Sequence, residues 1–395
     1  MNKRFLQTIR IALLVVLIAA AGVVYPDFFT PQEAIALSSK SIGDYSKYYL
    51  AKSNEELIDG KIRVTSFGTT MLLFDDGTTQ VMVDGYITRV PEWWKDPQQE
   101  VETNKDWVNQ ALSEYAKVDR LKALFVAHSH FDHALDVAYI AKKTEAQLYG
   151  SESTLNIGRG GGVPEDKMTL YDPGKEVKVG EFTVTVLRSQ HSRPTPGVND
   201  DLGQVIGAPL TQPTMLLNYV EGNSFDFVIK HRDRSILVKP SANYIWGALE
   251  QVPPVNVLFL GMATAGSQTV RPETSPQMPM PQIPVCPEYR DFLKNFYDQT
   301  VDTLHPKLVI PIHWDDLQFK LEPTQILTPL DDRDLTVGFD FLVNRLTEDN
   351  IEFGIMPEAY QSVILFGDQG YGLSTNRNQY NVEHRLFQPT CPLNC

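Results

Sequence analysis

Short apolar segments alternate with amphipathic ones along most of this chain, and their lengths suit the strands and helices of a globular fold. Between residues 60 and 85 the apolar residues alternate or run continuously around the turn Asp75-Asp76-Gly77, which predicts two or three strands. The clearest later segments are a helix at 106–119, a strand at 121–127, a helix at 134–144, an amphipathic helix at 287–304 and a strand at 307–312. This alternation predicts an α/β fold.

Two long segments interrupt the pattern, at residues 188–214 and 264–287, and both are rich in Pro, Gly and Ser. Loops of this length inside a compact domain are commonly functional or mobile, so we expect them near a site. From about residue 370 the chain is rich in Asn, Gln and Tyr, which predicts a separate C-terminal tail.

The N-terminus has the pattern of a targeting segment. Lys3, Arg4 and Arg10 precede an uncharged apolar run over residues 11–25, which ends before Pro26-Asp27. The run is shorter than the ~20 residues of a typical spanning helix, so a cleaved secretion signal and a retained membrane anchor both stay open. Either predicts export to the cell envelope, as a periplasmic, outward-facing membrane-anchored or secreted protein, with membrane association through the N-terminus if the anchor is retained.

Charge and cysteine content narrow the function classes. The 395 residues include 35 Lys and Arg against 49 Asp and Glu, a net charge of -14, which speaks against nucleic acid as the main partner. Cys391 and Cys395 end the chain, so a disulfide between them is one alternative, while Cys286 lies apart. The sequence leaves the oligomeric state open.

The segment FVAHSHFDHALDVAYIA, residues 125–141, contains three of the chain's eight histidines and one aspartate within six positions. A pattern H-x-H-x-D-H should arise by chance with a probability on the order of 10⁻⁴ in a chain of this length. His128 and His130 leave an extended segment on the same side, and Asp132 and His133 follow at the turn into a helix. Imidazoles with a carboxylate suit zinc or a similar metal, Mn and Fe included, and the close spacing favours two cations over one.

Two further histidines follow apolar strands, where α/β folds place their sites. His191 ends TVLRSQH and His313 ends KLVIPIH, so both are predicted ligands. The remaining three, His231, His305 and His384, lie in a charged turn, at a helix end and in the tail, which predicts surface or capping positions.

These residues resemble the metallo-β-lactamase superfamily. The resemblance rests on the paired strands ending at Asp84, the run from His128 to His133, and the single histidines 191 and 313. Within the superfamily the chain is most similar to the branch with the ascorbate-lactone hydrolases and the N-acyl-phosphatidylethanolamine phospholipase D. The resemblance implies an αββα four-layer sandwich over residues 59–369, after a leader at 1–30 and an N-terminal extension or linker at 31–58, and before a tail at 370–395.

The resemblance also implies a ligand set. His128, His130 and His191 would hold one metal, and Asp132, His133 and His313 the other. In dinuclear members an aspartate bridging the metals follows the strand between the last two histidines, where SILVKPSANY offers Ser241 instead. A hydroxyl is a poor substitute for a bridging carboxylate, so one or two divalent ions remain open. Asp226 and Asp233 are weaker candidates to replace it.

The expected chemistry is metal-assisted hydrolysis of an ester, lactone, amide or phosphodiester in a small or lipid-like substrate. A divalent metal lowers the pKa of its water from 15.7 to about 7 and polarises the bond under attack. Asp132 would orient that water or return a proton, while Asp84 would accept from a ligand histidine or merely begin a turn.

Other residues are expected around the substrate. Arg159 and Arg193 would contact an anionic group, although the glycines after Arg159 also fit a plain turn. Trp93 and Trp94 would line a hydrophobic mouth, touch a membrane, or pack in the rim. A metal-stabilised binding or scaffold protein without turnover is the alternative function, favoured by Ser241. Resistance to β-lactams has only the export signal in its favour.

Overall fold

The fold comes from a computed structural model that describes residues 40–53, 56–57, 60–193, 201–266, 292–330 and 334–366. All of these belong to one compact unit that begins at Lys40. The predicted leader, the Cys391 and Cys395 pair, and most of the loop 264–287 lie outside the described residues. No helix in the described part of the chain combines the length and apolar character needed to cross a bilayer.

The first sheet contains seven strands in the order β16-β1-β2-β3-β5-β6-β7. Its N-terminal strands are antiparallel hairpins, whereas β3, β5, β6 and β7 run parallel. The strands are β1 (Ile62–Ser66), β2 (Leu72–Asp75), β3 (Gln80–Val83), β5 (Leu121–Phe125), β6 (Gln147–Gly150), β7 (Met168–Leu170) and β16 (Ser362–Leu365). The three strands at 62–83 agree with the prediction for residues 60–85.

The second sheet also has seven strands, in the order β15-β14-β13-β12-β11-β9-β8. Its strands are β8 (Glu176–Val179), β9 (Phe182–Ser189), β11 (Ser224–His231), β12 (Arg234–Lys239), β13 (Val257–Gly261), β14 (Leu308–Ile312) and β15 (Glu352–Phe353). A separate pair joins β4 (Glu100–Val101) to β10 (Thr214–Met215).

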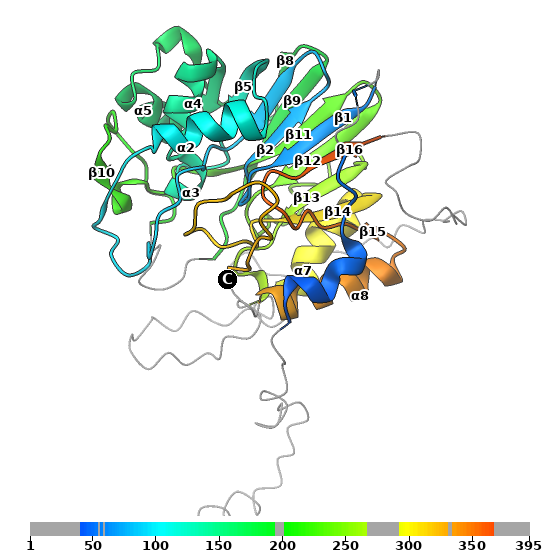
Figure 1. The fold of residues 1–395 in the computed structure, drawn as a ribbon. Coiled ribbons are helices and arrows are strands. Elements are labelled where there is room, and N and C mark those ends of the chain that lie inside the picture. The colour runs from blue at the N-terminus through cyan, green and yellow to red at the C-terminus, as the bar shows by residue number, and fades with distance from the viewer. Residues whose placement is uncertain are drawn as a thin grey trace, which may run out of the picture. The chain divides into compact units, whose positions relative to one another are not determined.

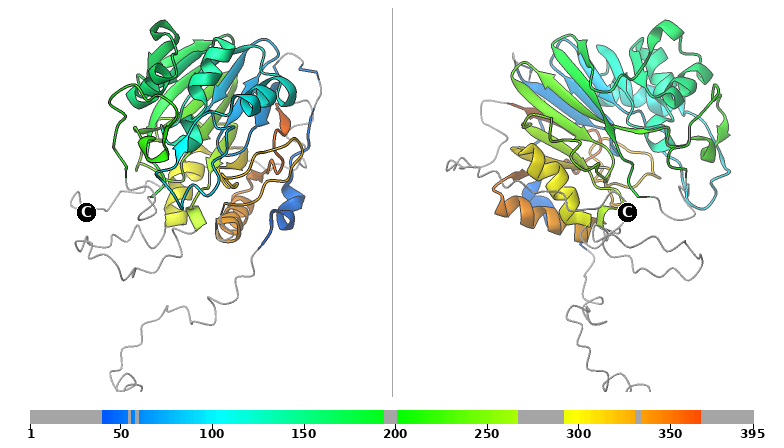
Figure 2. Two further views of the ribbon diagram at one scale, coloured as in Figure 1. Left: turned by 60° about the vertical axis from the view of Figure 1, so that its left-hand side comes forward. Right: turned by 180° about the vertical axis from the view of Figure 1, so that it is seen from behind.

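Helices cover the outer faces of the two sheets (Figures 1 and 2). Those on the first sheet are α2 (Lys105–Gln110), continued by a π-helical turn at Ala111–Tyr115, α3 (Phe131–Ala134), α4 (Val137–Thr144) and α5 (Glu152–Gly160). Those on the second sheet are α7 (Phe292–Tyr297), continued at Asp298–Asp302, and α8 (Asp340–Glu348), preceded by a π-helical segment at Asp334–Phe339. Short 3-10 helices are η1 (Ile42–Tyr48), η3 (Glu165–Lys167) and η4 (Leu216–Asn218).

Three hydrophobic cores separate these layers. Side chains of a strand alternate between its two faces, so Leu124 of β5 packs under the helices while Ala123 and Phe125 point between the sheets. Phe227 and Phe259 of the second sheet lie in the same inter-sheet core. Both faces of the central strands are buried, which explains their continuous apolar runs. The αββα sandwich expected from the resemblance is confirmed.

Two features differ from the sequence-based picture. Residues 42–48, expected to belong to an extension or linker, form η1, which buries Ile42 and Tyr45 in the core under α8. His231, predicted at the surface, is only 2% exposed and its Nε2 lies 3.2 Å from Asp76 Oδ2. The charged turn that follows His231 gave no signal of this pairing, because Asp76 lies in a distant turn, directly after β2 of the other sheet.

A buried ion pair between Arg89 and Asp315 connects segments next to the predicted ligand His313. Arg89 donates to the carbonyl of Phe67 at 2.9 Å, and its Nη1 lies 3.7 Å from Asp315 Oδ2. The Asp315 carboxylate accepts from the backbone N–H of Thr69 at 2.8 Å. Burial raises the pKa of Asp315, and Arg89 opposes that shift. The carbonyl of Thr69 in turn accepts from the N–H of His313 at 2.8 Å, so the pair fixes the backbone that carries this histidine.

Replacing Arg89 should therefore destabilise the fold strongly. We expect Arg89→Met to lower the free energy of unfolding by about 3–5 kcal/mol, because Asp315 would remain as an unpaired buried charge. Lys95 forms an exposed pair with Glu92 at 2.6 Å, so Lys95→Ala should cost less than about 1 kcal/mol. Equilibrium urea unfolding measures both, and equal losses would contradict the role of the buried pair.

Candidate functional site

The predicted ligands lie at the carboxyl ends of strands from both sheets. His128 follows β5 by three residues, His191 follows β9 by two, and His313 directly follows β14. Within the second sheet β9 points the same way as β14, and the ligand atoms that follow β5 and β9 lie within 4.8 Å of one another. Their ends therefore meet at one edge of the sandwich, and the sandwich brings all six predicted ligands together.

The first group of ligands is His128, His130 and His191, whose ligand atoms all lie within 4.8 Å of one another. Nδ1 of His130 lies 3.2 Å from Nε2 of His191. Two nitrogens of a tetrahedral zinc site, each at about 2.0–2.1 Å from the ion, lie about 3.3 Å apart. This spacing fits a shared metal and agrees with the grouping that the resemblance implied.

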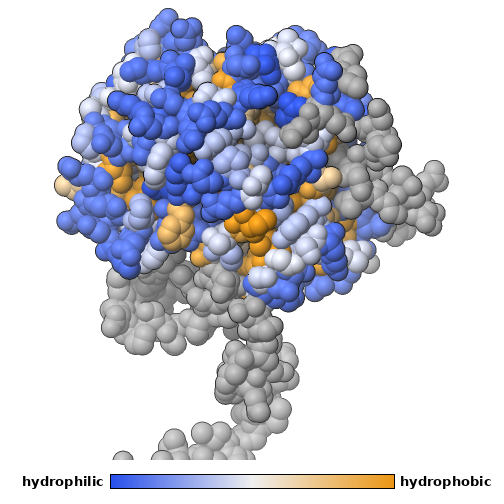
Figure 3. All heavy atoms as spheres, viewed as in Figure 1, coloured by the Kyte–Doolittle hydropathy of each residue, from blue (hydrophilic) through white to orange (hydrophobic). Residues whose placement is uncertain are grey.

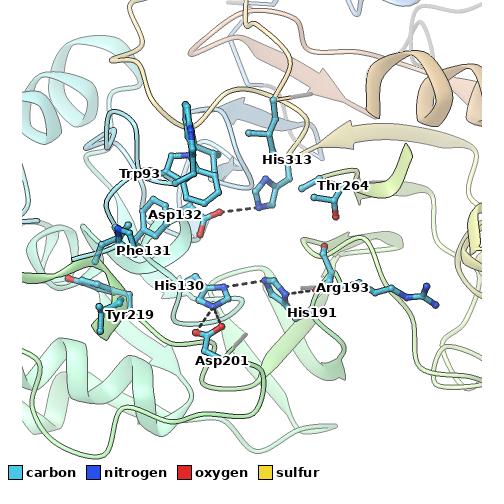
Figure 4. A pocket seen from close by; sticks show the side chains of 18 residues that line it. Trp93, His130, Phe131, Asp132, His191, Arg193, Asp201, Tyr219, Thr264 and His313 are labelled. Atoms are coloured by element: carbon cyan, nitrogen blue, oxygen red, sulfur yellow. Dashed lines mark hydrogen bonds and ion pairs between the residues drawn. The ribbon is translucent and has the colours of Figure 1, made fainter. Parts of the chain in front are cut away.

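The second group forms around Asp132. Its Oδ2 lies 3.3 Å from Nε2 of His313 and 3.7 Å from Nε2 of His133. His128 also lies within ligand distance of Asp132 and His133. His128 therefore belongs to both groups. Figure 4 shows four of the other ligands, His130, His191, Asp132 and His313.

Unpartnered nitrogens test whether a metal fits. Both ring nitrogens of His128 and Nε2 of His133 are buried without a hydrogen-bond partner among the described residues. Each of the six residues is at most 9% exposed. An unpaired buried polar atom costs about 1–3 kcal/mol, so a cluster of them needs a compensating ligand. Coordination to a divalent cation would satisfy these nitrogens at once.

The protonation states also suit coordination. Burial lowers the pKa of His128 well below its ordinary value, and the surrounding imidazoles lower it further. Burial lowers the pKa of His191 to about 3. Burial would raise the pKa of Asp132, but His133 and His313 beside it hold that pKa far below its usual range. Neutral imidazoles at His128 and His191 and an ionised carboxylate at Asp132 are the forms that bind metal. Burial lowers the pKa of His133, but the carboxylates beside it raise that pKa overall, so metal binding would have to displace a proton from this ring.

Asp84 lies behind the second group, at the end of β3. Its Oδ2 lies 2.8 Å from Nδ1 of His133, and its Oδ1 accepts from the N–H of Ala127 at 2.7 Å. Thr70 donates to the same carboxylate at 2.5 Å. A carboxylate bound to the far nitrogen of a ligand histidine fixes its tautomer and orientation, which is the position that the sequence analysis expected of Asp84.

Asp201 occupies the equivalent position behind the first group, and the sequence analysis missed it. Its two carboxylate oxygens lie 3.0 and 3.1 Å from Nε2 of His130. It also accepts from the N–H of Glu221 at 3.1 Å, and the carbonyl of Glu221 accepts from Ser129, between the two histidines. Asp201 belongs to the long loop 188–214, and only the length and position of that loop indicated a functional segment.

Ser241 is the residue at the position where the resemblance implied a bridging aspartate. Ser241 lies two residues after β12 and is buried, but within the described part of the chain it makes no hydrogen bond to any of the six ligands. Asp226 instead pairs with Lys239, whose Nζ lies 3.0 Å from Oδ2, and Asp233 is exposed beside Arg234. None of the three supplies a carboxylate to the cluster, so the structure gives no substitute for the bridging aspartate at these positions.

A pocket of about 220 Å³ opens above the ligands. His130, Asp132, His191 and His313 line its polar side, together with Arg193, whose guanidinium lies 4.9 Å from the ring centre of Phe292. The expectation for Arg159 fails, because this side chain is not among the pocket residues. Its guanidinium is held at the end of α5 by Glu152 at 2.5 Å and Glu165 at 2.8 Å.

The chain belongs to the metallo-β-lactamase superfamily. Residues 96–314, more than half of the chain, match the family described as a beta-lactamase superfamily domain. That range includes β5, β9 and β14, whose ends precede His128, His191 and His313, and all six predicted ligands.

Curated relatives match shorter parts of the chain. A UPF0173 metal-dependent hydrolase of Roseiflexus sp. (strain RS-1) is 25% identical over 124 residues, 31% of this chain and 48% of that protein. A UPF0173 metal-dependent hydrolase of Anaeromyxobacter sp. (strain K) is 27% identical over 150 residues, 36% of this chain and 47% of that protein. The matched part of the chain therefore spans about half of the length of these relatives.

Solved structures with a similar chain path include a metallo hydrolase from the archaeon Ignicoccus hospitalis. The similarity covers 78% of this chain and 100% of that one, at 13% identity and a TM-score of 0.44. The diiron β-hydroxylase CmlA from Streptomyces venezuelae is similar over 79% of this chain and 55% of its own, at 13% identity and a TM-score of 0.45.

Removing either carboxylate behind the ligands should weaken metal binding. We expect Asp84→Asn and Asp201→Asn each to lower zinc affinity about 10–100-fold, because the histidine they orient loses its anionic partner. Competition with a chromogenic chelator measures the Kd. Asp172, 73% exposed at its side chain, gives the matched control Asp172→Asn, and an equal affinity in all three variants would contradict the assignment.

Proposed function

We propose that the protein is an exported, metal-dependent hydrolase that cleaves an ester, lactone, amide or phosphodiester bond in a small or lipid-like substrate. The observation that carries the proposal is the cluster of six buried ligands with unpartnered nitrogens at the floor of a pocket. A structural metal is usually enclosed by protein, whereas a catalytic metal keeps a position open toward substrate. Four of the six ligands line the pocket, which supports the catalytic alternative.

The residues of the two groups would hold one or two divalent ions, with zinc as the favoured metal. His128, His130 and His191 would hold the first, while Asp132, His133 and His313 would hold the second. When bound, such an ion lowers the pKa of water toward neutrality and polarises the bond to be cleaved.

Asp132 would act directly in the reaction. Its carboxylate lines the pocket, stays ionised beside His133 and His313, and faces the space where a substrate would lie. We assign it to accept a hydrogen bond from the attacking water and to return the proton to the leaving group. His130 would be held in place by Asp201, and His133 by Asp84, so that the ligands need little reorganisation when substrate enters.

A metal-stabilised binding protein is the second candidate, because Ser241 stands where related dinuclear enzymes carry a bridging carboxylate. Loss of that carboxylate weakens the case for a second ion but leaves the first group of three histidines complete. Export rests on the charged and apolar leader at residues 1–30.

The first experiment is the metal content of the purified protein, measured by mass spectrometry beside a panel of chromogenic lactone, carboxylester, phosphodiester and β-lactam substrates. We expect one or two equivalents of metal, and turnover that both a chelator and His130→Ala remove by a factor of at least about 100.

The exposed His305 gives a control, with His305→Asn expected to keep the metal and the turnover. Asn suits this position because residue 305 has a positive φ of 45°. Metal without turnover on any substrate would favour the binding alternative, and absence of metal would overturn the whole proposal.

A further inference from the structure

The pocket has two unlike sides. On the side opposite His191 and Arg193, Figure 4 shows Trp93, Phe131 and Tyr219. Six side chains, which we call the apolar wall, extend this side toward the surface: Trp93, Trp94, Pro97, Leu216, Leu217 and Tyr219. None of the six is ionisable at neutral pH.

The wall is a built feature rather than a chance gathering of apolar residues. Two segments far apart in sequence form it, and β4 pairs with β10 next to it. The N–H of Leu217 donates to the carbonyl of Pro97 at 3.0 Å, and the N–H of Leu216 donates to Gln99 at 2.9 Å. These bonds hold residues 97–99 against residues 216–217, so the wall has a defined surface.

The wall continues directly from the ligand cluster. The ring of Trp93 lies 5.8 Å from that of Phe131, the residue between His130 and Asp132, and 5.9 Å from that of Trp94. A group bound along these rings would therefore begin beside the ligands and end at the pocket mouth. The hydroxyl of Tyr219 accepts from Gln212 at 2.7 Å, so this polar atom already has a partner.

Large apolar side chains are exposed where the wall reaches the mouth. Trp94 is 45% exposed and Leu217 46%, and Met215 beside them in β10 is also 46% exposed. Figure 3 shows hydrophobic surface near β10 within a largely hydrophilic face. Apolar side chains that rim a pocket in this way mark a ligand surface, because burying them removes apolar area from water.

We propose that the apolar wall binds an unbranched acyl chain of the substrate, with the bond to be cleaved at the ligand cluster. The inference rests on the proposed function and narrows its substrate class to acyl compounds. A sugar or peptide would need polar partners along its length, and among the six side chains of the wall the polar atoms are limited to the two indole nitrogens and the hydroxyl of Tyr219.

Alkyl hydroxamates test this directly, because their head group binds metal and only the tail differs along the series. The dissociation constants of acetohydroxamate, hexanohydroxamate and octanohydroxamate for the zinc-loaded full-length protein are measured by calorimetry. We expect the affinity to rise about two- to fourfold for each added methylene. Benzohydroxamate should bind more weakly than octanohydroxamate.

Two variants show where the alkyl chain of the hydroxamate binds. Octanohydroxamate should bind more tightly than acetohydroxamate by a ratio that we call the chain-length gain. The double substitution Trp94→Ala with Leu217→Ala should reduce this gain about tenfold or more. Trp246 is the matched control, since it is a tryptophan that is 50% exposed but does not line the pocket. Trp246→Ala should leave the gain unchanged.

The outcomes separate this inference from the proposed function. Equal binding of acetohydroxamate and octanohydroxamate, tighter binding of benzohydroxamate, or an undiminished gain in the double variant would overturn the acyl subsite while the metal centre stands. Failure of every hydroxamate to bind would overturn the metal centre, and the subsite with it. Co-sedimentation with phosphatidylcholine vesicles distinguishes the source of the chain. If the protein sediments with the vesicles and Trp94→Ala abolishes this, the acyl chain belongs to a bilayer lipid. If the protein does not sediment with vesicles although hydroxamate affinity rises with chain length, the acyl chain belongs to a monomeric ester.

Discussion

The hydrophobic core between the two sheets is the contact on which the site depends. Phe125 of the first sheet and Phe227 of the second meet there, with ring centres 6.0 Å apart. This contact joins the end of β5 to β11, the strand that pairs with β9. Because His128 and His130 follow β5 within five residues and His191 follows β9 within two, a shift of one sheet against the other would separate them. Side chains in close-packed interiors tolerate little displacement, so the core sets the metal distances.

Electrostatics at the strand ends follow from that packing. The sandwich buries imidazoles in a region that offers His128 no hydrogen-bond partner among the described residues. Each ligand histidine that does have a carboxylate behind it takes that carboxylate from another segment, Asp84 for His133 and Asp201 for His130. The free nitrogens then face one another, an arrangement that favours a cation at the centre. Function at this edge is therefore a consequence of burying polar groups without other partners.

The pocket beside the ligand cluster has one polar side and one apolar side. Its polar side belongs to strand ends, which the core holds rigidly, while its apolar side belongs to two loops joined by β4 and β10. Rigid ligands with a loop-built binding surface are a common division in enzymes, since loops vary in sequence without disturbing the scaffold. This division explains how one fold serves many substrates, and why the substrate here is inferred from the wall rather than from the fold.

The sequence by itself determined the sheet-forming segments, the H-x-H-x-D-H cluster and the two later histidines, because each is a local pattern or follows directly from a strand. For Asp84 it left two alternatives, a carboxylate behind a ligand histidine or the start of a turn, and the structure places the carboxylate 2.8 Å from Nδ1 of His133. Only the tertiary structure decided the partners that come from distant segments: Asp201 at His130, Asp76 at the buried His231, and Lys239 at Asp226. It likewise showed Arg159 bound to glutamates of its own neighbourhood, away from the pocket. Side-chain pairing across loops depends on distances that close only when the two sheets pack, and no local spacing in the chain encodes those distances.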